Sequence, residues 1–285
     1  MSTASRYPGI LSTWILVLTV AWLPHGTAYA VEVYFPQFGD ATAKANLNFR
    51  YESGSLEKDW IIEVNGSGTA LFDYDNDGDL DIYLVNASYL DLKPGDPHPA
   101  NRLYRNNGNW KFTDVTEISG TGSTAWGVGC AAADYDNDGD LDLYVTNWGL
   151  NHLYRNNGDG TFTDVAQDAG VQGGNWSSGC AFGDIDRDGD LDLYVARYLD
   201  FDHHKIPKRG ERASCTLAGT IPIHCGPKGL TPLPDLLYRN NGDGTFTDIS
   251  DSSGIRLVEN AFGLGVIFLD FNLDGLADIY VTDDV

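Results

Sequence analysis

The residues with the clearest chemical potential in this sequence are aspartates grouped in nine-residue acidic segments. The first segment spans residues 73–81 and reads DYDNDGDLD, and close copies occupy residues 134–142 and 184–192. A weaker copy, DFNLDGLAD, occupies residues 270–278. Calcium takes six to eight hard oxygen ligands in a flexible cage, and short Asp side chains at alternate positions can converge on one ion. The four segments therefore predict calcium sites, with Ca²⁺ as the cofactor.

Each position in an acidic segment has an expected role. Side chains at positions 1, 3, 5 and 9 supply oxygens, position 7 supplies its backbone carbonyl, and Gly at position 6 permits a sharp turn. The predicted metal ligands are Asp73, Asp75, Asp77, Asp79 and Asp81; Asp134, Asp136, Asp138, Asp140 and Asp142; Asp184, Asp186, Asp188, Asp190 and Asp192; and Asp270, Asn272, Asp274, Leu276 and Asp278. The fourth set carries fewer charges, so we expect it to bind more weakly.

Two other interpretations of the acidic segments are weaker. An EF-hand needs a Glu at loop position 12 and flanking helices, whereas position 12 here is Leu84, Val145, Val195 or Val281, each within an alternating, strand-like stretch. A solvated turn without a bound ion leaves five carboxylates within nine residues to repel one another in each of the first three segments. Both comparisons favour calcium loops placed between strands.

The elements that must position these loops form a repeat. The acidic segments start at residues 73, 134, 184 and 270, and a second motif, LYRNNG, occupies residues 103–108, 153–158 and 237–242. Each copy of the second motif leads into Phe-Thr-Asp. Repeats of about 50 residues are typical of propellers and arrays rather than of one mixed globule.

One repeat predicts four strands, at residues 127–134, 141–145, 152–155 and 161–165, with a turn at 156–160. Four antiparallel strands make one propeller blade, whereas a β-solenoid would need shorter units. We therefore expect an all-β fold, a β-propeller of four-stranded blades with calcium-binding loops. Residues 31–285 are expected to form about four blades of an incomplete propeller.

Composition limits the classes of partner. The chain has 285 residues, of which 42% are hydrophobic, and 41 Asp and Glu against 18 Lys and Arg give a formal charge of −23. The apolar content is sufficient for a sizeable core and excludes a disordered acidic tail. Nucleic acids and anionic membranes require basic patches, so we expect neither as a partner.

Residues 1–30 have the features of a signal peptide. Arg6 precedes an apolar stretch at residues 10–23, and Ala28-Tyr29-Ala30 matches a cleavage site. The apolar stretch is shorter than the roughly 20 residues of a membrane span, although a retained N-terminal anchor is the alternative. We expect cleavage after Ala30, a secreted, extracellular or periplasmic protein, and no membrane insertion afterwards.

Residues 201–234 form an insertion between repeats and contain Cys215 and Cys225. In an exported protein a disulfide between these two cysteines is the favoured prediction. A zinc site that also uses His203, His204 and His224 is the alternative, but the spacings match no standard pattern. We expect this insertion to form a stapled loop on one face and to make partner contacts.

Cysteines and aromatic residues also recur at fixed repeat positions. Cys130 and Cys180 each precede an acidic segment by four residues, and they are either buried thiols or a disulfide between adjacent blades. Trp126, Trp176 and Phe262 recur four residues earlier still. Packing between blades is the favoured role of these rings, and an aromatic surface that stacks on sugars is the alternative.

The acidic segments resemble the FG-GAP/VCBS repeats of integrin-α-type propellers. Three stretches are similar to the cartilage acidic protein (ASPIC/UnbV-associated) family: residues 153–165, the sequence CGPKGL at 225–230, and GLGV at 263–266. The resemblance implies an exported, calcium-binding propeller, usually without known catalysis. Such propellers commonly close with about seven blades and carry a C-terminal ASPIC/UnbV module. This sequence, which ends at Val285, therefore resembles a C-terminally truncated member.

Together these observations predict an exported calcium-binding propeller that acts as a binding or adhesion module and has no catalysis of its own. Its expected partner is an extracellular protein or glycan. The alternative is a polysaccharide-active, lyase-like enzyme or a lectin on the same scaffold. A lyase needs a base such as His203, His204 or His224, and no nucleophile elbow or phosphate loop accompanies them.

Overall fold

The computed structural model describes residues 36–93, 95–96, 98–212, 215–224, 226–227, 229–257 and 261–284. The predicted signal peptide and Cys225 lie outside these residues. The chain divides into two compact units, Met1–Gly39 and Asp40–Val285. The described residues of the first unit, 36–39, are exposed and have no regular structure. All elements below belong to the second unit.

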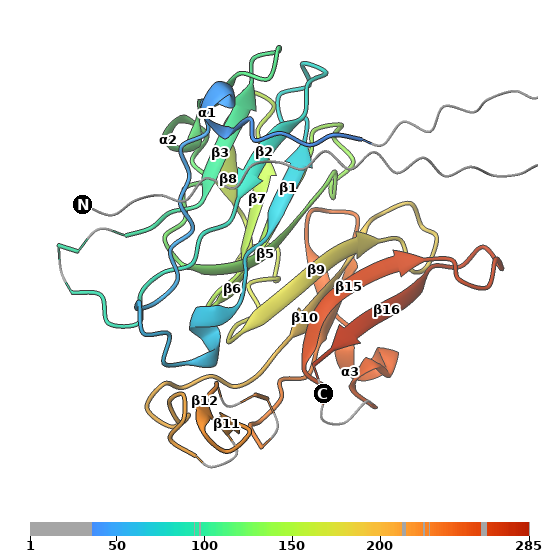
Figure 1. Cartoon of the computed structure of the whole chain (residues 1–285). Coiled ribbons are helices and arrows are strands. Elements are labelled where there is room, and N and C mark those ends of the chain that lie inside the picture. Colours follow the sequence, from blue (N-terminus) through green and yellow to red (C-terminus); the bar gives the residue numbers. More distant parts are fainter. Residues whose placement is uncertain are drawn as a thin grey trace, which may run out of the picture. The chain divides into compact units, whose positions relative to one another are not determined.

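Antiparallel sheets dominate the second unit and follow one another in chain order (Figure 1). The first sheet contains β1 (Thr69–Phe72), β2 (Asp81–Leu84), β3 (Arg102–Asn106) and β4 (Phe112–Asp114). The second contains β5 (Trp126–Ala133), β6 (Asp142–Trp148), β7 (His152–Asn156) and β8 (Phe162–Asp164). The third contains β9 (Ser177–Gly183), β10 (Asp192–Arg197), β13 (Leu236–Asn240) and β14 (Phe246–Asp248). A pair, β15 (Gly263–Leu269) and β16 (Asp278–Asp283), follows.

The remaining elements are short. A small hairpin, β11 (Thr216–Leu217) and β12 (Ile221–Pro222), lies within the insertion. The helices are α1 (Thr42–Ala45), α2 (Thr116–Ser119), α3 (Ser250–Ser253) and the 3-10 turns η1 (Ile61–Val64) and η3 (Ile255–Leu257). The predicted all-β class and four-stranded blades are confirmed. Three blades are complete, and the described residues of the fourth supply two strands.

The first strand of each blade packs directly on the first strand of the next, so β9 lies between β5 and β15 (Figure 1). Glycine makes this close approach feasible. A Cβ atom on Gly129 would lie 2.5 Å from the Ser178 carbonyl oxygen, and one on Gly179 would lie 2.6 Å from the Leu264 carbonyl oxygen. The small-residue first strands predicted from the sequence therefore have a packing reason.

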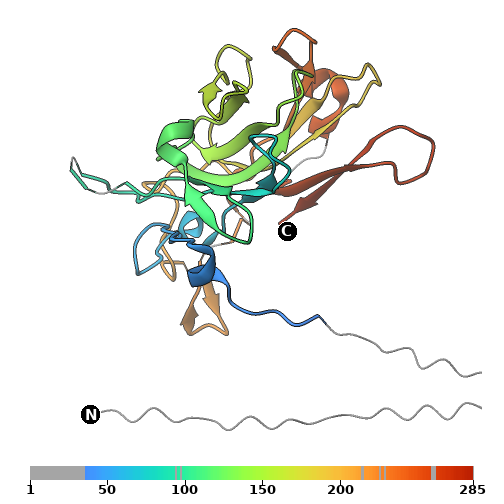
Figure 2. The same ribbon diagram turned by 90° about the horizontal axis from the view of Figure 1, so that it is seen from above.

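Hydrophobic cores lie between successive blades rather than within one blade. Tyr83, Tyr144 and Tyr194 occupy equivalent positions on the second strands and are 0%, 0% and 3% exposed. Tyr280 occupies the same position on β16 and is 61% exposed. The β15–β16 pair projects at the end of the row of sheets (Figure 2). Burial of this tyrosine thus depends on a following blade, and the described residues form an incomplete propeller.

The recurring aromatic residues are packing residues. Trp126, Trp176 and Phe262 are all buried in one cluster. The Trp176 ring makes edge contacts with Tyr198 at 4.9 Å and with Phe201 at 5.6 Å between centroids. The packing interpretation is confirmed, and these buried rings are not a surface on which a sugar can stack.

The insertion differs from the expected surface loop, because its first part belongs to the core. Phe201 and Ile206 are buried in the same aromatic cluster, and Leu230 and Leu233 pack against it. The other described residues of the insertion, including its basic residues and the hairpin of β11 and β12, are mostly exposed. Hydrophobic side chains at both ends of residues 201–234 explain the difference, since they cover the aromatic cluster that the blades leave open.

We expect the substitution Phe201→Ala to destabilise the protein by about 3–5 kcal/mol, the usual cost of removing a buried phenylalanine. Phe201 is 4% exposed and contacts both Trp148 and Trp176. Leu217→Ala is the matched control, because Leu217 lies on β11 of the same insertion and is 58% exposed. Urea unfolding of both variants measures the difference, and equal midpoints would show that the insertion is not part of the core.

Candidate metal centres

The acidic loops join the first strand of each blade to the second. In the first loop Phe72 pairs with Asp81 across β1 and β2, so the chain leaves and re-enters the sheet at facing positions. Ala133 with Asp142, Gly183 with Asp192 and Leu269 with Asp278 repeat this register. The two ends of every loop are therefore held together by the sheet.

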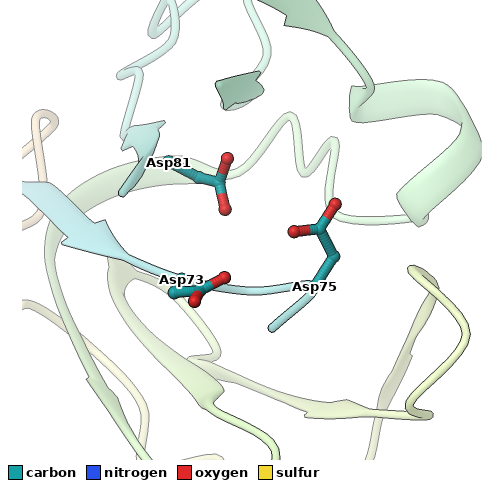
Figure 3. Close-up of side chains that lie close together, drawn as sticks. All are labelled: Asp73, Asp75 and Asp81. Atoms are coloured by element: carbon teal, nitrogen blue, oxygen red, sulfur yellow. The ribbon is translucent and has the colours of Figure 1, made fainter. Parts of the chain in front are cut away.

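Three aspartates converge in each of the first three loops. Asp73, Asp75 and Asp81 offer carboxylate oxygens that all lie within 4.8 Å of one another, and the side chains face a common space (Figure 3). The equivalent residues at positions 1, 3 and 9 of the second and third loops form the same clusters: Asp134, Asp136 and Asp142, and Asp184, Asp186 and Asp192. These clusters can hold a metal ion.

Hydrogen bonds from the backbone hold the turn. In the first loop the Asp73 carboxylate accepts the Asp77 amide at 3.1 Å and the Gly78 amide at 2.8 Å. Gly78 has φ +90°, and the glycine at the same position of the other loops also has a positive φ. The glycine predicted for the sharp turn is therefore required by its backbone conformation.

The aspartate at position 9 is buried in each of the first three loops. The Asp142 carboxylate accepts the Tyr135 amide at 3.1 Å and the Asn156 amide at 2.8 Å. Burial nevertheless raises the pKa of Asp142 to about 7, and it raises the pKa of Asp81 to about 6. A bound divalent cation would favour the ionised carboxylate and offset the cost of burying it.

Two carboxylate oxygens in the clusters show whether a cation would fit there. Asp75 Oδ1 and Asp136 Oδ1 are shielded from solvent and have no hydrogen-bond partner. An unsatisfied buried oxygen is costly, and a carboxylate oxygen within a cluster of carboxylates is an acceptor without a donor. A hard cation satisfies such an oxygen, so the residues of the first two loops fit one.

The fourth loop keeps the turn but not the three-carboxylate cluster. The Asp270 carboxylate accepts the Asp274 and Gly275 amides at 3.0 and 2.7 Å, as its counterpart does in the first loop. Asn272 stands at position 3, and its side chain donates to Asp274 Oδ2 at 2.9 Å. Weaker binding by this loop stays a prediction.

The side chains at positions 5 and 7 do not join the clusters. Asp138 Oδ1 accepts the backbone amide of Asp140 at 2.9 Å. The Asp140 carboxylate points toward Gly158 of its own blade and accepts a hydrogen bond from Asn76 of the preceding loop at 2.6 Å. A backbone carbonyl ligand at position 7, and a side-chain ligand at position 5, remain predictions.

The first asparagine of each LYRNNG motif is a site residue that sequence reasoning missed. Its backbone amide bonds the position 9 carboxylate, as Asn240 does to Asp192 at 2.8 Å. Its side chain bonds the carbonyl at position 8 of the same loop, as Asn240 does to Leu191 at 3.1 Å. The fixed recurrence of this motif after every complete acidic segment was the available signal.

Comparison with known families decides the relationship. The FG-GAP-like repeat profile matches residues 73–145, 134–195 and 231–281, which together contain all four acidic loops. The chain belongs to the FG-GAP-like repeat family. The family resemblance expected from the acidic segments is thereby confirmed.

Individual relatives of this FG-GAP-like protein match in part. Cartilage acidic protein 1 of Xenopus tropicalis is 50% identical over 46 residues, which is 16% of this chain and 7% of that protein. A solved Agrocybe aegerita lectin, described as recognising non-reducing terminal N-acetylglucosamine, is 17% identical with a TM-score of 0.38. The structural match covers 74% of this chain and 45% of the lectin. The FG-GAP-like chain thus spans less than half the length of either protein.

No helix in the described part of the FG-GAP-like chain combines the length and the apolar character that a membrane span requires. The signal peptide and export stay predictions.

Within the part of the chain that the structure describes, the histidines of the insertion belong to no metal cluster. The His203 ring lies against Trp60 at 5.9 Å and His204 at 3.8 Å, whereas His224 Nε2 bonds the Lys58 carbonyl. Among the described residues, the groups with three convergent metal ligands are the three aspartate clusters. The zinc alternative therefore has no support there. Cys215 is buried, but Cys225 lies outside the described residues, so their disulfide stays a prediction.

Cys130 on β5 and Cys180 on β9 are free and partly buried, so the thiol interpretation holds and no disulfide joins these two blades. Burial raises the pKa of Cys130 to about 12 and raises the pKa of Cys180 well above its ordinary value. We expect native Cys130 to react with iodoacetamide on the order of a thousandfold more slowly than an ordinary thiol, because so little thiolate forms. Mass mapping measures the labelling. Urea-unfolded protein, in which both thiols should react, is the control, and rapid native labelling at either residue would contradict the prediction.

Proposed function

We propose that this FG-GAP-like chain is an exported calcium-binding propeller that acts as a binding module. The observation that carries the proposal is the convergence of three aspartates in each of three loops, with solvent-shielded, unpartnered oxygens on Asp75 and Asp136. Export follows from the predicted signal peptide, residues 1–30. The disulfide Cys215–Cys225 would suit the same compartment.

Calcium suits these loops better than other cations. Each cluster supplies three carboxylates from a nine-residue loop, and position 7 would add a carbonyl, which gives an all-oxygen set. Magnesium demands near-ideal octahedral geometry and gives up water reluctantly, whereas calcium accepts irregular oxygen cages. The aspartates at positions 1, 3 and 9 would hold the ion, and the ion would neutralise their mutual repulsion. The side chain at position 5 would add a further oxygen ligand. The fourth loop, with Asn272 at position 3, would bind calcium more weakly.

The proposed partner is an extracellular protein or a glycan. The exposed part of the insertion is the main departure from the repeat, and it includes Lys205, Lys208 and Arg209 on an otherwise acidic chain. Lys205 pairs with Asp202, and Lys208 pairs with Asp59, at 2.8 and 2.9 Å. In each pair the carboxylate holds the lysine at the surface and offsets its charge, so an acidic partner would compete with Asp202 and Asp59 for these lysines.

The metal part of the proposal is tested by calorimetric titration of the purified chain with calcium chloride. We expect at least three calcium ions per chain, and one fewer in each of the variants Asp75→Ala and Asp136→Ala. Asp168→Ala is the matched control, because Asp168 is exposed and lies outside the acidic loops. An isotherm without binding heat in the intact protein, confirmed by equilibrium dialysis, would overturn the calcium assignment.

The partner is sought with a printed glycan array and a panel of immobilised extracellular matrix proteins, each probed with calcium and with chelator. Calcium-dependent capture on either surface supports a binding module. Incubation with acidic polysaccharides, followed by analysis of the products, provides the opposing outcome. Cleavage products in that assay would replace the binding module with an enzyme.

A further inference from the structure

We propose that calcium ions enter the acidic loops cooperatively, because each loop is hydrogen-bonded to the loop of the next blade. This inference rests on the proposed calcium sites and concerns how they are coupled. Two independent sets of contacts carry it. One starts from position 4 of each loop, and the other from the first asparagine of the LYRNNG motif.

The position 4 contacts join consecutive loops directly. Asn76 Nδ2 donates to Asp140 Oδ1 at 2.6 Å, and Asn137 Nδ2 donates to Asp190 Oδ1 at 2.8 Å. In the third loop, the Arg187 guanidinium donates to the Gly275 carbonyl oxygen of the fourth. All three donor residues have a positive φ, between 57° and 64°, which is uncommon for residues other than glycine. The backbone adopts this conformation at position 4 of the first three loops, and each of these three side chains reaches the next loop.

The motif asparagines make a second, buried connection. Asn156 Nδ2 donates to the Leu141 carbonyl of its own loop at 3.2 Å and to the Tyr74 carbonyl of the preceding loop at 2.8 Å. Asn240 Nδ2 bridges Leu191 and Tyr135 in the same way. These side chains are almost inaccessible to solvent, at 2% and 3% exposure. Each also donates its backbone amide to the position 9 aspartate of its own metal cluster.

Ligand binding to one loop therefore orders parts of its neighbour. A cation held by Asp134, Asp136 and Asp142 fixes the second loop, and with it the acceptor Asp140 and the bridging Asn156. Those two residues hold Asn76 and Tyr74, which flank the ligand Asp75 of the first loop. The first ion bears the entropic cost of ordering these shared residues. The second ion does not bear that cost again, so it binds more tightly. Such coupling is reciprocal, and we expect about a fivefold effect, at the low end of the usual range, because exposed hydrogen bonds contribute to it.

The experiment follows each loop separately in protein labelled with [¹⁵N]glycine and titrated with calcium chloride alone. The glycine amide at position 6 donates to the position 1 aspartate in every loop, so one resonance reports each site. The reporters are Gly78, Gly139, Gly189 and Gly275.

The second loop is disabled by Asp136→Asn, which keeps the shape of the side chain. We expect the midpoint of the Gly78 resonance to move to about fivefold higher calcium in this variant. Asn76→Gly removes the direct connection without straining a residue at positive φ, and it should raise the Gly78 midpoint and reduce its response to Asp136→Asn. Comparison of the two single variants with the double variant isolates the coupling.

Leu273→Gly is the matched control. Leu273 occupies position 4 of the fourth loop with φ 61° and is 87% exposed, and its side chain has no hydrogen-bonding group that could reach another loop. This substitution should leave the Gly78, Gly139 and Gly189 midpoints unchanged.

The outcomes distinguish metal binding by the loops from coupling between them. If none of the four glycine resonances responds to calcium, the proposed metal sites are wrong and their coupling is wrong with them. If the resonances respond, but the Gly78 midpoint is the same in the intact protein, Asp136→Asn and Asn76→Gly, the loops bind independently. That result overturns the coupling and leaves the proposed function intact.

Discussion

Removal of calcium should lower the melting temperature of this FG-GAP-like protein by roughly 8–16 °C, at about 2–4 °C per kcal/mol for a domain of this size. Extracellular calcium modules bind with dissociation constants of about 0.1–1 mM. At about 1 mM calcium, a 0.1 mM site adds about 1.4 kcal/mol, and three such sites add about 4 kcal/mol. The physical reason is the mutual repulsion of the carboxylates gathered in each cluster, on a chain of charge −23.

Scanning calorimetry with calcium, with chelator and with magnesium measures this effect. Calcium should restore the melting temperature more fully than magnesium, which tolerates an irregular oxygen cage poorly. Asp75→Ala and Asp136→Ala should each lower the calcium-loaded melting temperature and reduce the further loss caused by chelator. Asp168→Ala should behave as the unmodified chain does. Superimposable melting curves with calcium and with chelator would falsify a role for calcium in folding.

The parts of the fold that could be predicted from sequence are those encoded locally. Alternation around Leu143 and Val145 predicts a strand, and the recurrence of a LYRNNG motif after each of the first three acidic segments predicts a repeated blade. The turn at Gly78 follows from the chemistry of one residue and has the expected positive φ. The strand and the turn depend on neighbours within about ten residues, and the blade pattern depends on the same motifs recurring along the chain.

Features that depend on contacts between blades could not be predicted. Asn156 bonds the Tyr74 carbonyl across 82 positions of sequence, and nothing local to either residue specifies the other. Phe201 lies in a segment whose length and charge indicate a surface loop, yet it completes a cluster of aromatic residues from several blades. Within a blade, the sequence predicts side-chain ligands at positions 1, 3, 5 and 9, and those at positions 1, 3 and 9 converge.

The glycines at the contact between first strands are the basis of a further prediction about stability. Gly68, Gly129 and Gly179 each stand five residues before the first aspartate of an acidic loop. A Cβ atom on Gly68 would lie 2.8 Å from the Gly129 Cα atom, and one on Gly129 would meet the Ser178 carbonyl oxygen. The obstacle at each position is backbone of the next blade, which cannot rotate away as a side chain can.

We expect Gly129→Val to destabilise the protein by about 1–3 kcal/mol or more, the range for forcing extra volume into a packed interior. The added atoms would also meet Thr146 Oγ1, which accepts the Gly129 amide at 2.8 Å and donates to the Ser178 carbonyl. Gly66→Val is the matched control, because a Cβ there meets nothing within 4 Å. Urea unfolding of both variants in saturating calcium measures the effect on packing apart from that on metal binding. A Gly129→Val midpoint equal to that of Gly66→Val would mean that the first strands lie farther apart than the structure places them.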